Sequence, residues 1–177
     1  MKHDWKSYSV IAGVIVIGLM SLFFHNVLFF LLITLATVLL ALILGFFEPL
    51  KYTGLELITL TTMLVGVVYG PWLGGLYGLI MLIVHLVLGR YYISQYVIWL
   101  VPEYIALGMF SGILGLQNLS GTLGLSFIIG MNVVNLILTA VTETERVVNL
   151  LPYAIGNSII NSLVFIWFFN SLVTFIG

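Results

Sequence analysis

Seven long apolar runs follow one another along this chain, with only short polar breaks between them. The runs are continuous and lack the alternation of polar and apolar residues that membrane barrels show, so they predict helices. Only 6% of the residues are charged, whereas a soluble domain carries about 25%. We therefore expect an all-α integral membrane protein, a helical bundle that crosses the plasma membrane several times.

The runs predict seven crossings within a single membrane domain, residues 1–177. The first run, 8–24, is at the short end of what crosses about 30 Å of hydrocarbon. The first two runs therefore form either two crossings or a hairpin that does not fully cross. The later runs are expected at 27–47, 56–69, 71–88, 96–116, 122–141 and 150–176.

A glycine stripe opens the fourth run. Gly70, Gly74 and Gly78 recur every four residues, so on a helix they share one face that has no side chains. Such a face lets a neighbouring helix approach closely in a bilayer, and Pro71 fits the first turn of this helix. We expect this helix to be the packing axis of the bundle, with His85 pointing into the protein.

The charged residues gather in alternate loops, which fixes an expected orientation. With seven crossings, Lys2 and Lys6 fall on the same side as these loops, and the positive-inside rule places that side in the cytoplasm. The loops after the second, fourth and sixth runs hold Lys51, Arg90, Arg146, Glu48, Glu143 and Glu145.

The fifth run carries an acid within its apolar stretch. Tyr96, Trp99 and Glu103 share one helical face. An ionisable side chain inside a membrane helix is costly and indicates a functional site, and aromatic rings beside it suit a cationic or heterocyclic ligand. The alternative is that Glu103 reaches the membrane interface, with Tyr96 and Trp99 as interfacial aromatic residues.

A polar stripe begins the last run, where Tyr153, Asn157 and Asn161 are spaced four apart. Amides both donate and accept hydrogen bonds, which suits a polar heterocycle. Hydrogen bonding between helices explains Asn157 equally well, and it explains the deeper Asn161 better. On the sixth run, Asn132 and Asn135 are expected to make contacts between helices.

Several chemistries find no support in the sequence. The chain has no cysteine, no histidine pair at helical spacing and no nucleotide-binding or nucleophile motif. Glu143 and Glu145 are two residues apart and would face different directions on a helix. We therefore expect no enzyme activity, no metal and no cofactor, and the lack of a basic patch argues against nucleic acid as a partner.

The middle of the chain has a recognisable order of motifs. A short run is followed by Gly70-Pro71-Trp72-Leu73-Gly74-Gly75-Leu76-Tyr77-Gly78, a tyrosine-containing loop, and a helix with Glu103-Tyr104 and Leu107-Gly108-Met109-Phe110-Ser111-Gly112. The last helix opens with Tyr153-Ala154-Ile155-Gly156-Asn157. This order resembles the substrate-binding S components of energy-coupling factor vitamin transporters, and the thiamin-specific member in particular.

The resemblance implies six S-component-like helices over 27–177, with 8–24 as an extra N-terminal helix. It implies that Glu103 and Asn157 contact the solute, because a glutamate and an asparagine do so at the matching positions of the thiamin-specific member. Members of the family carry an Ala-x-x-x-Ala motif for the coupling subunit, whereas Ala36 and Ala41 are five apart.

Two alternatives stay open at this point. In the family the ligand loops face outside, whereas here the same loops carry the basic residues, so the two criteria for orientation disagree. The rod-shape membrane proteins of bacteria have a fold similar to S components and are the second candidate family.

We expect a subunit that binds a small, vitamin-like or heterocyclic solute of thiamin-like, cationic character. It would lie among membrane lipids and depend on a coupling transmembrane subunit and ATPases in other chains, since this chain has no nucleotide motif. Glu103 would supply a counter-charge, although Arg90 or Arg146 could hold an anionic group instead. The competing class is a non-transport membrane scaffold. The candidate substrate-binding residues are Glu103, Asn157, Tyr96, Trp99, Tyr153, Arg90, Tyr91 and Arg146.

Overall fold

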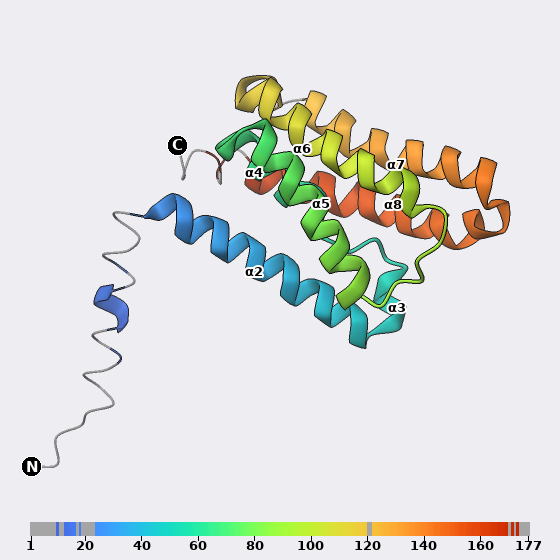
Figure 1. Cartoon of the computed structure of the whole chain (residues 1–177), viewed down its shortest axis with the longest axis horizontal. Helices are drawn as coiled ribbons and strands as arrows, with labels where there is room; N and C mark the ends of the chain where they lie inside the picture. The colour runs from blue at the N-terminus through green and yellow to red at the C-terminus, as the bar shows by residue number, and fades with distance from the viewer. Residues whose placement is uncertain are drawn as a thin grey trace, which may run out of the picture.

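The computed structural model describes residues 24–119 and 122–169, together with isolated positions nearer the two ends of the chain. Within these residues the chain is all-helical and contains no strand, in agreement with the expected fold class (Figure 1). The elements are α2 (His25–Phe46), α3 (Glu48–Lys51), α4 (Ile58–Tyr69), α5 (Pro71–Leu88), α6 (Val97–Leu119), α7 (Thr122–Thr142), η1 (Thr144–Arg146), α8 (Val147–Val164) and η2 (Phe165–Phe169).

Five helical segments are long and apolar enough to cross a membrane, which indicates a membrane protein. They are Asn26–Phe46, Pro71–Leu88, Val97–Leu119, Thr122–Thr142 and Thr144–Phe169.

The other two expected crossings, 8–24 and 56–69, are not among these five segments. Helix α4 has 12 residues, which at 1.5 Å per residue gives a length of about 18 Å, well short of the hydrocarbon thickness. The run 8–24 falls largely outside the described residues, so the expected count of seven is left as a prediction.

Two boundaries differ from the expected ones, for local reasons. The polar segment between the sixth and seventh runs is not a loop to residue 149, because a single turn, η1, connects directly to α8 at Val147. In α6 the helical backbone is interrupted earlier than the expected turn. The interruption lies at Gly115, whose φ of 67° favours a residue without a side chain.

The helices form two groups with a third element beside them. Helices α4, α5 and α6 pack most extensively against one another, and α7 packs against α8. Figure 1 shows α2 lying to one side of both groups, where it contacts α5. The buried core includes Met63 and Leu64 from α4, Met81 from α5 and Leu107 from α6.

The glycine stripe on α5 packs against neighbouring backbone, as expected. A Cβ atom on Gly74 would lie 2.5 Å from the Cα of Gly66 on α4, and one on Gly78 would lie 2.5 Å from the carbonyl oxygen of Tyr104 on α6. Gly70 is an exception, because it has open space around its Cβ position and a φ of 94°. It makes the turn between α4 and α5, and it does not belong to the packing face.

Candidate functional site

A cavity of about 990 Å³ lies among α4, α5, α6, α7 and α8. Charged residues of α3, of the connection 89–96 and of η1 line one end of it, and Glu48, Arg90 and Glu145 are exposed there. We call this end the mouth. Buried residues line the other end, among them Thr59 of α4, Asn132 of α7 and Asn157 of α8. We call this end the floor.

Tyrosine and asparagine make up about half of the polar residues on the cavity wall. Aromatic rings provide stacking surfaces, and tyrosine hydroxyls and amides provide hydrogen-bonding groups, which is the usual make-up of a small-molecule pocket. The tyrosines are Tyr52, Tyr91, Tyr92, Tyr96, Tyr104 and Tyr153, and the asparagines are Asn132, Asn135, Asn149 and Asn157.

Most residues proposed from the sequence as substrate-binding line this cavity. The two that do not are Glu103 and Trp99, although both lie on α6. The side chains that the fold brings together around the cavity are Arg90, Tyr91, Tyr96, Arg146, Tyr153 and Asn157.

Glu103 lies in a different environment. It lines a separate, apolar groove of about 390 Å³ between α6 and α7, beside Phe110 and Val134. Both carboxylate oxygens are buried, and neighbouring Asn135 makes no well-formed hydrogen bond with them. Because successive helical residues point about 100° apart, Tyr104 faces the cavity while Glu103 does not. Glu103 therefore does not line the cavity, and its expected role as a counter-charge stays a prediction.

A different glutamate, Glu56, sits beneath the floor. It is 1% exposed, and its carboxylate accepts hydrogen bonds from the N–H groups of Ile58 and Thr59 at the start of α4. A carboxylate is favourable there because the first N–H groups of a helix have no partner within the helix. Its other oxygen accepts from the Thr59 hydroxyl at 2.7 Å and from Asn157 and Asn161 of α8 at 2.9 and 3.0 Å.

Asn157 is at the centre of a polar network that joins three parts of the chain. Its Nδ2 atom donates to Glu56 and to the carbonyl oxygen of Gly54 at 3.1 Å. Its Oδ1 atom accepts from Asn132 of α7 at 2.8 Å. The expected contact between helices is therefore present at Asn132, and Asn157 combines this structural role with a position on the cavity wall.

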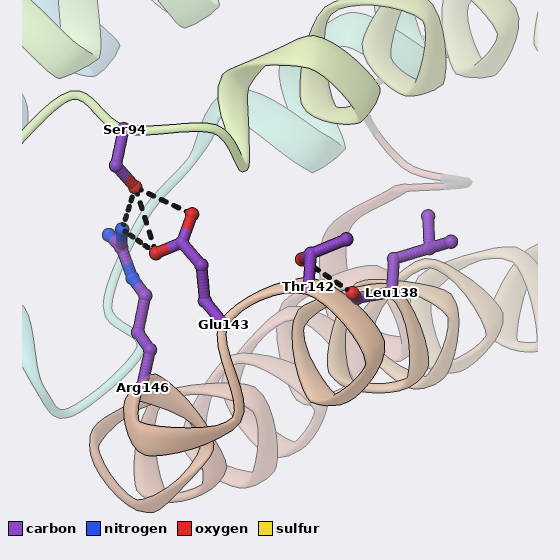
Figure 2. A network of polar contacts seen from close by, with 5 residues as sticks. All are labelled: Ser94, Leu138, Thr142, Glu143 and Arg146. Carbon is purple, nitrogen blue, oxygen red and sulfur yellow. Dashed lines mark hydrogen bonds and ion pairs between the residues drawn. The ribbon is translucent and has the colours of Figure 1, made fainter.

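The mouth is bridged by a group of residues that we call the latch: Ser94, Tyr96, Glu143 and Arg146. Figure 2 shows Ser94 between the side chains of Glu143 and Arg146. Its hydroxyl donates to the Glu143 carboxylate at 2.9 Å, and Arg146 Nη1 donates to Ser94 Oγ at 2.5 Å. Arg146 also pairs with Glu143 at 3.3 Å, the expected surface pair, and its guanidinium lies 3.8 Å from the Tyr96 ring centroid.

The contacts within the latch change the pKa of Glu143. Partial burial would raise the pKa of Glu143, but the hydrogen bond from Ser94 and the nearby Arg146 charge outweigh it, so the pKa lies below its usual value. The carboxylate is therefore charged near neutral pH, and the latch joins the 89–96 connection to η1 across the mouth.

The other basic groups at the mouth bind rings and a carbonyl oxygen. Lys51 donates to the Arg90 carbonyl oxygen at 3.2 Å and lies 5.6 Å from the Tyr91 ring. Arg90 lies 5.5 Å from the ring of Phe46. Neither forms an ion pair with a residue that the structure describes.

His85 points inward, as expected from the stripe, and is 6% exposed. Its ring stacks on Tyr91 at 4.9 Å between centroids and lines the cavity. Burial raises the pKa of the Tyr91 hydroxyl, and the negative charge of Glu56 raises it further, so Tyr91 stays protonated. The described residues include no group of three potential metal ligands.

Sequence reasoning missed Glu56, Tyr104 and His85 as site residues. One signal for Glu56 was available, since an acid directly before an apolar, threonine-containing run is a typical helix-start position. Its partners on α8, Asn157 and Asn161, are more than a hundred positions away and gave no local signal. No protein-family model, curated protein or solved structure matches the chain.

Proposed function

We propose that this chain is the substrate-binding membrane subunit of an uptake system for a small vitamin-like or heterocyclic solute. The proposal places it in the plasma membrane, where separate ATPase subunits and a coupling transmembrane subunit supply the energy. The observation that carries the proposal is the tyrosine-rich cavity of about 990 Å³. Its volume is at the upper end of the range for small-molecule sites, and packed helices seldom leave such a space unfilled.

The cavity suggests a role for each group of residues around it. Tyr96 and Tyr153 offer ring faces to a flat solute, and Asn157 offers a polar edge deeper in the cavity. Arg146 is already engaged in the latch, which leaves Arg90 and Lys51 to attract an anionic group at the mouth. Glu103 and Trp99 do not line the cavity and have no role in the proposed site.

The alternative proposal is a non-transport scaffold of the rod-shape protein type. Such a protein would use small-residue faces to bind other membrane helices. Here Gly66, Gly74, Gly78 and Gly108 contact backbone within the chain itself, so those faces are already occupied. This favours the substrate-binding proposal over the scaffold.

A binding screen tests the proposed function. Purified protein is heated with vitamins, their precursors and nucleobases, and a ligand raises the midpoint of thermal unfolding because it binds only the folded state. We expect at least one solute to stabilise the protein, and Tyr153→Ala to weaken its binding about tenfold, the loss of roughly one ring contact.

The matched control is Trp72→Ala, an aromatic truncation on a side chain that is 79% exposed at the far end of α5. It should leave affinity unchanged. If no solute in the panel stabilises the wild type, the proposal is wrong and the scaffold is favoured.

The side of the membrane that the mouth faces can be measured separately. The chain contains no cysteine, so cysteines introduced at Lys51 and Glu145 are unique labels on either side of the mouth. An uptake protein requires both to react with a membrane-impermeant reagent added outside intact cells. Labelling only after the cells are opened would contradict uptake from outside.

A further inference from the structure

The direction of each hydrogen bond at the cavity floor follows from the chemistry of its partners. Asn157 Nδ2 faces the carbonyl oxygen of Gly54 and the carboxylate of Glu56. Both partners accept and do not donate, so both amide protons of Asn157 are committed there. Its Oδ1 atom must then be the group that faces Asn132.

The same reasoning extends to Asn132. Its Nδ2 atom donates to the carbonyl oxygen of Ile128 at 3.0 Å and to Oδ1 of Asn157 at 2.8 Å. Both amide protons of Asn132 are donated to these two acceptors, so the polar atom of Asn132 that remains for a solute is Oδ1. Asn132 lines the cavity, and what it presents to a solute is an acceptor.

The donor in the contact between Tyr104 and Thr59 can be assigned in the same way. The Thr59 hydroxyl has one proton, which goes to the Glu56 carboxylate at 2.7 Å. The Tyr104 hydroxyl, 3.2 Å from Thr59 Oγ1, is therefore the donor in that contact. Its own proton is committed, and its oxygen is left as an acceptor on the cavity wall.

We propose that the cavity floor is a hydrogen-bond acceptor surface whose direction is set by the buried carboxylate of Glu56, so that it selects solutes with an N–H-rich or cationic inner end. This inference rests on the proposed function and specifies its substrate class. Glu56 draws in the protons of Thr59 and Asn157, and Asn157 Oδ1 in turn accepts from Asn132. The oxygen atoms of Asn132 and Tyr104 are left as acceptors on the cavity wall. Glu56 does not line the cavity itself, so it is a positioning residue.

The net charge beneath the floor points to the same class. Among the described residues Glu56 forms no ion pair, and its partners there are neutral donors. An amino-substituted or protonated heterocycle would bring both donors for the oxygen atoms of Asn132 and Tyr104 and a compensating positive charge.

The test uses four small aromatic probes that differ in donor capacity. Benzamidine is cationic and its polar edge only donates, whereas benzoate is anionic and only accepts. Benzamide and acetophenone are both neutral and of equal size, and differ by one NH₂ in place of CH₃. We expect benzamidine to bind the purified protein at least about tenfold more tightly than benzoate, and benzamide more tightly than acetophenone, since one or two good hydrogen bonds are worth that much.

Two variants separate positioning from general stability. Glu56→Gln places an amide that donates among the existing donors, so we expect the preference for benzamidine and benzamide to fall to about one. Tyr104→Phe removes one acceptor, and should weaken benzamidine several-fold while leaving acetophenone unchanged. Glu103→Gln makes the same change of acid to amide outside the cavity and should keep the wild-type ratios.

Each outcome bears on one of the two proposals. If neither the probes nor the vitamin panel bind, the proposed function fails and the inference with it. If solutes bind but the wild type prefers benzoate or acetophenone, the floor is not an acceptor surface, although the binding function stands. A Glu56→Gln protein that binds all four probes with unchanged ratios would overturn the positioning role. If that variant does not fold, the wild-type ratios and Tyr104→Phe decide.

Discussion

The two sides of this molecule are held together by different kinds of contact. Helices α4, α5 and α6 meet backbone to backbone, where a Cβ atom on Gly108 would lie 2.1 Å from the carbonyl oxygen of Gly74. Polar side chains join α7 to α8, through Asn132 and Asn157, and join α8 to the segment just before α4, through Asn157 and Glu56. The first side packs closely at these glycines, whereas the cavity lies between the two sides.

The difference suggests a division of roles between the two sides. Close backbone contact excludes water and tolerates almost no change of shape. Polar side chains have specific partners but can change rotamer or exchange a bond with a solute at modest cost. We infer that α4, α5 and α6 form a fixed wall and that α7 and α8 form the wall that adapts to a ligand.

The largest expected effect lies in the fixed wall. Gly108→Ala introduces a methyl group where backbone already lies, so α5 and α6 must separate. We expect a loss of roughly 3 kcal/mol in the free energy of unfolding, the upper range for overpacked sites, measured as a lower midpoint of thermal unfolding.

Gly130→Ala is the matched control for this change, because Gly130 on α7 has open space at its Cβ position. It should be neutral, or slightly stabilising because alanine favours helix. Equal destabilisation by the two variants would remove the distinction between the walls.

A smaller effect is expected where the polar side meets α4. Glu56→Gln leaves at least one donor without an acceptor in a buried site, which we expect to cost about 2 kcal/mol. Glu103→Gln should cost nothing or stabilise, because the Glu103 carboxylate has no well-formed hydrogen bond to lose. Thermal unfolding of both variants, side by side, makes this comparison, and the reverse order would show that Glu103 is the buried acid on which the fold depends.

The smallest effect on stability, and the clearest on access, is expected at the latch. Arg146→Gln removes a partly exposed pair at the mouth, and surface pairs of this kind add little to folding. It should nevertheless speed the reaction of a thiol reagent with a cysteine introduced at Thr139, a buried residue on the cavity wall. An unchanged reaction rate would mean that the latch does not control access to the cavity.

The latch should also respond to acid in a defined direction. The pKa of Glu143 is depressed from its ordinary 4.5, so the contribution of the carboxylate is fully present above that value and is lost as the pH falls through the lower, folded pKa. Access to the cysteine at Thr139, relative to free thiol, should be constant from about pH 8 to 5 and rise below about 4.5. The Arg146→Gln variant should show a smaller rise.

Much of the fold could be predicted because membrane helices are local features. Pro71 and the glycine before it mark the start of α5, and the face shared by Gly74 and Gly78 identifies which side packs inward. Gly70 was assigned to that face wrongly, because four-residue spacing alone does not distinguish a helical glycine from one that ends a helix with positive φ.

The site was harder to predict, because neighbouring residues on one helix can face different surroundings. Glu103 and Tyr104 are adjacent, and only the packing of α7 decides that the tyrosine faces the cavity while the acid faces an apolar groove. Asn157 was proposed because it lies in a polar stripe, and Tyr96 because it shares a helical face with Trp99 and Glu103. Arg146 was proposed because it lies in a charged loop. Glu56 acquires its importance from partners on α8 that are distant in the chain.

Helix α4 is too short to span a membrane by itself. Its length sets the thickness of the protein layer that would separate a solute bound in the cavity from the other side of the membrane. A solute resting against Thr59, in the first turn of α4, has beneath it a plug about as deep as the helix is long, about 18 Å. The hydrocarbon layer is about 30 Å thick, so a bound solute would already have covered more than a third of the crossing. In the proposed uptake role, the rest of the path is closed by close backbone packing, which includes the glycine contacts at Gly66 and Gly74. Transport would require those helices to part or the whole subunit to tilt.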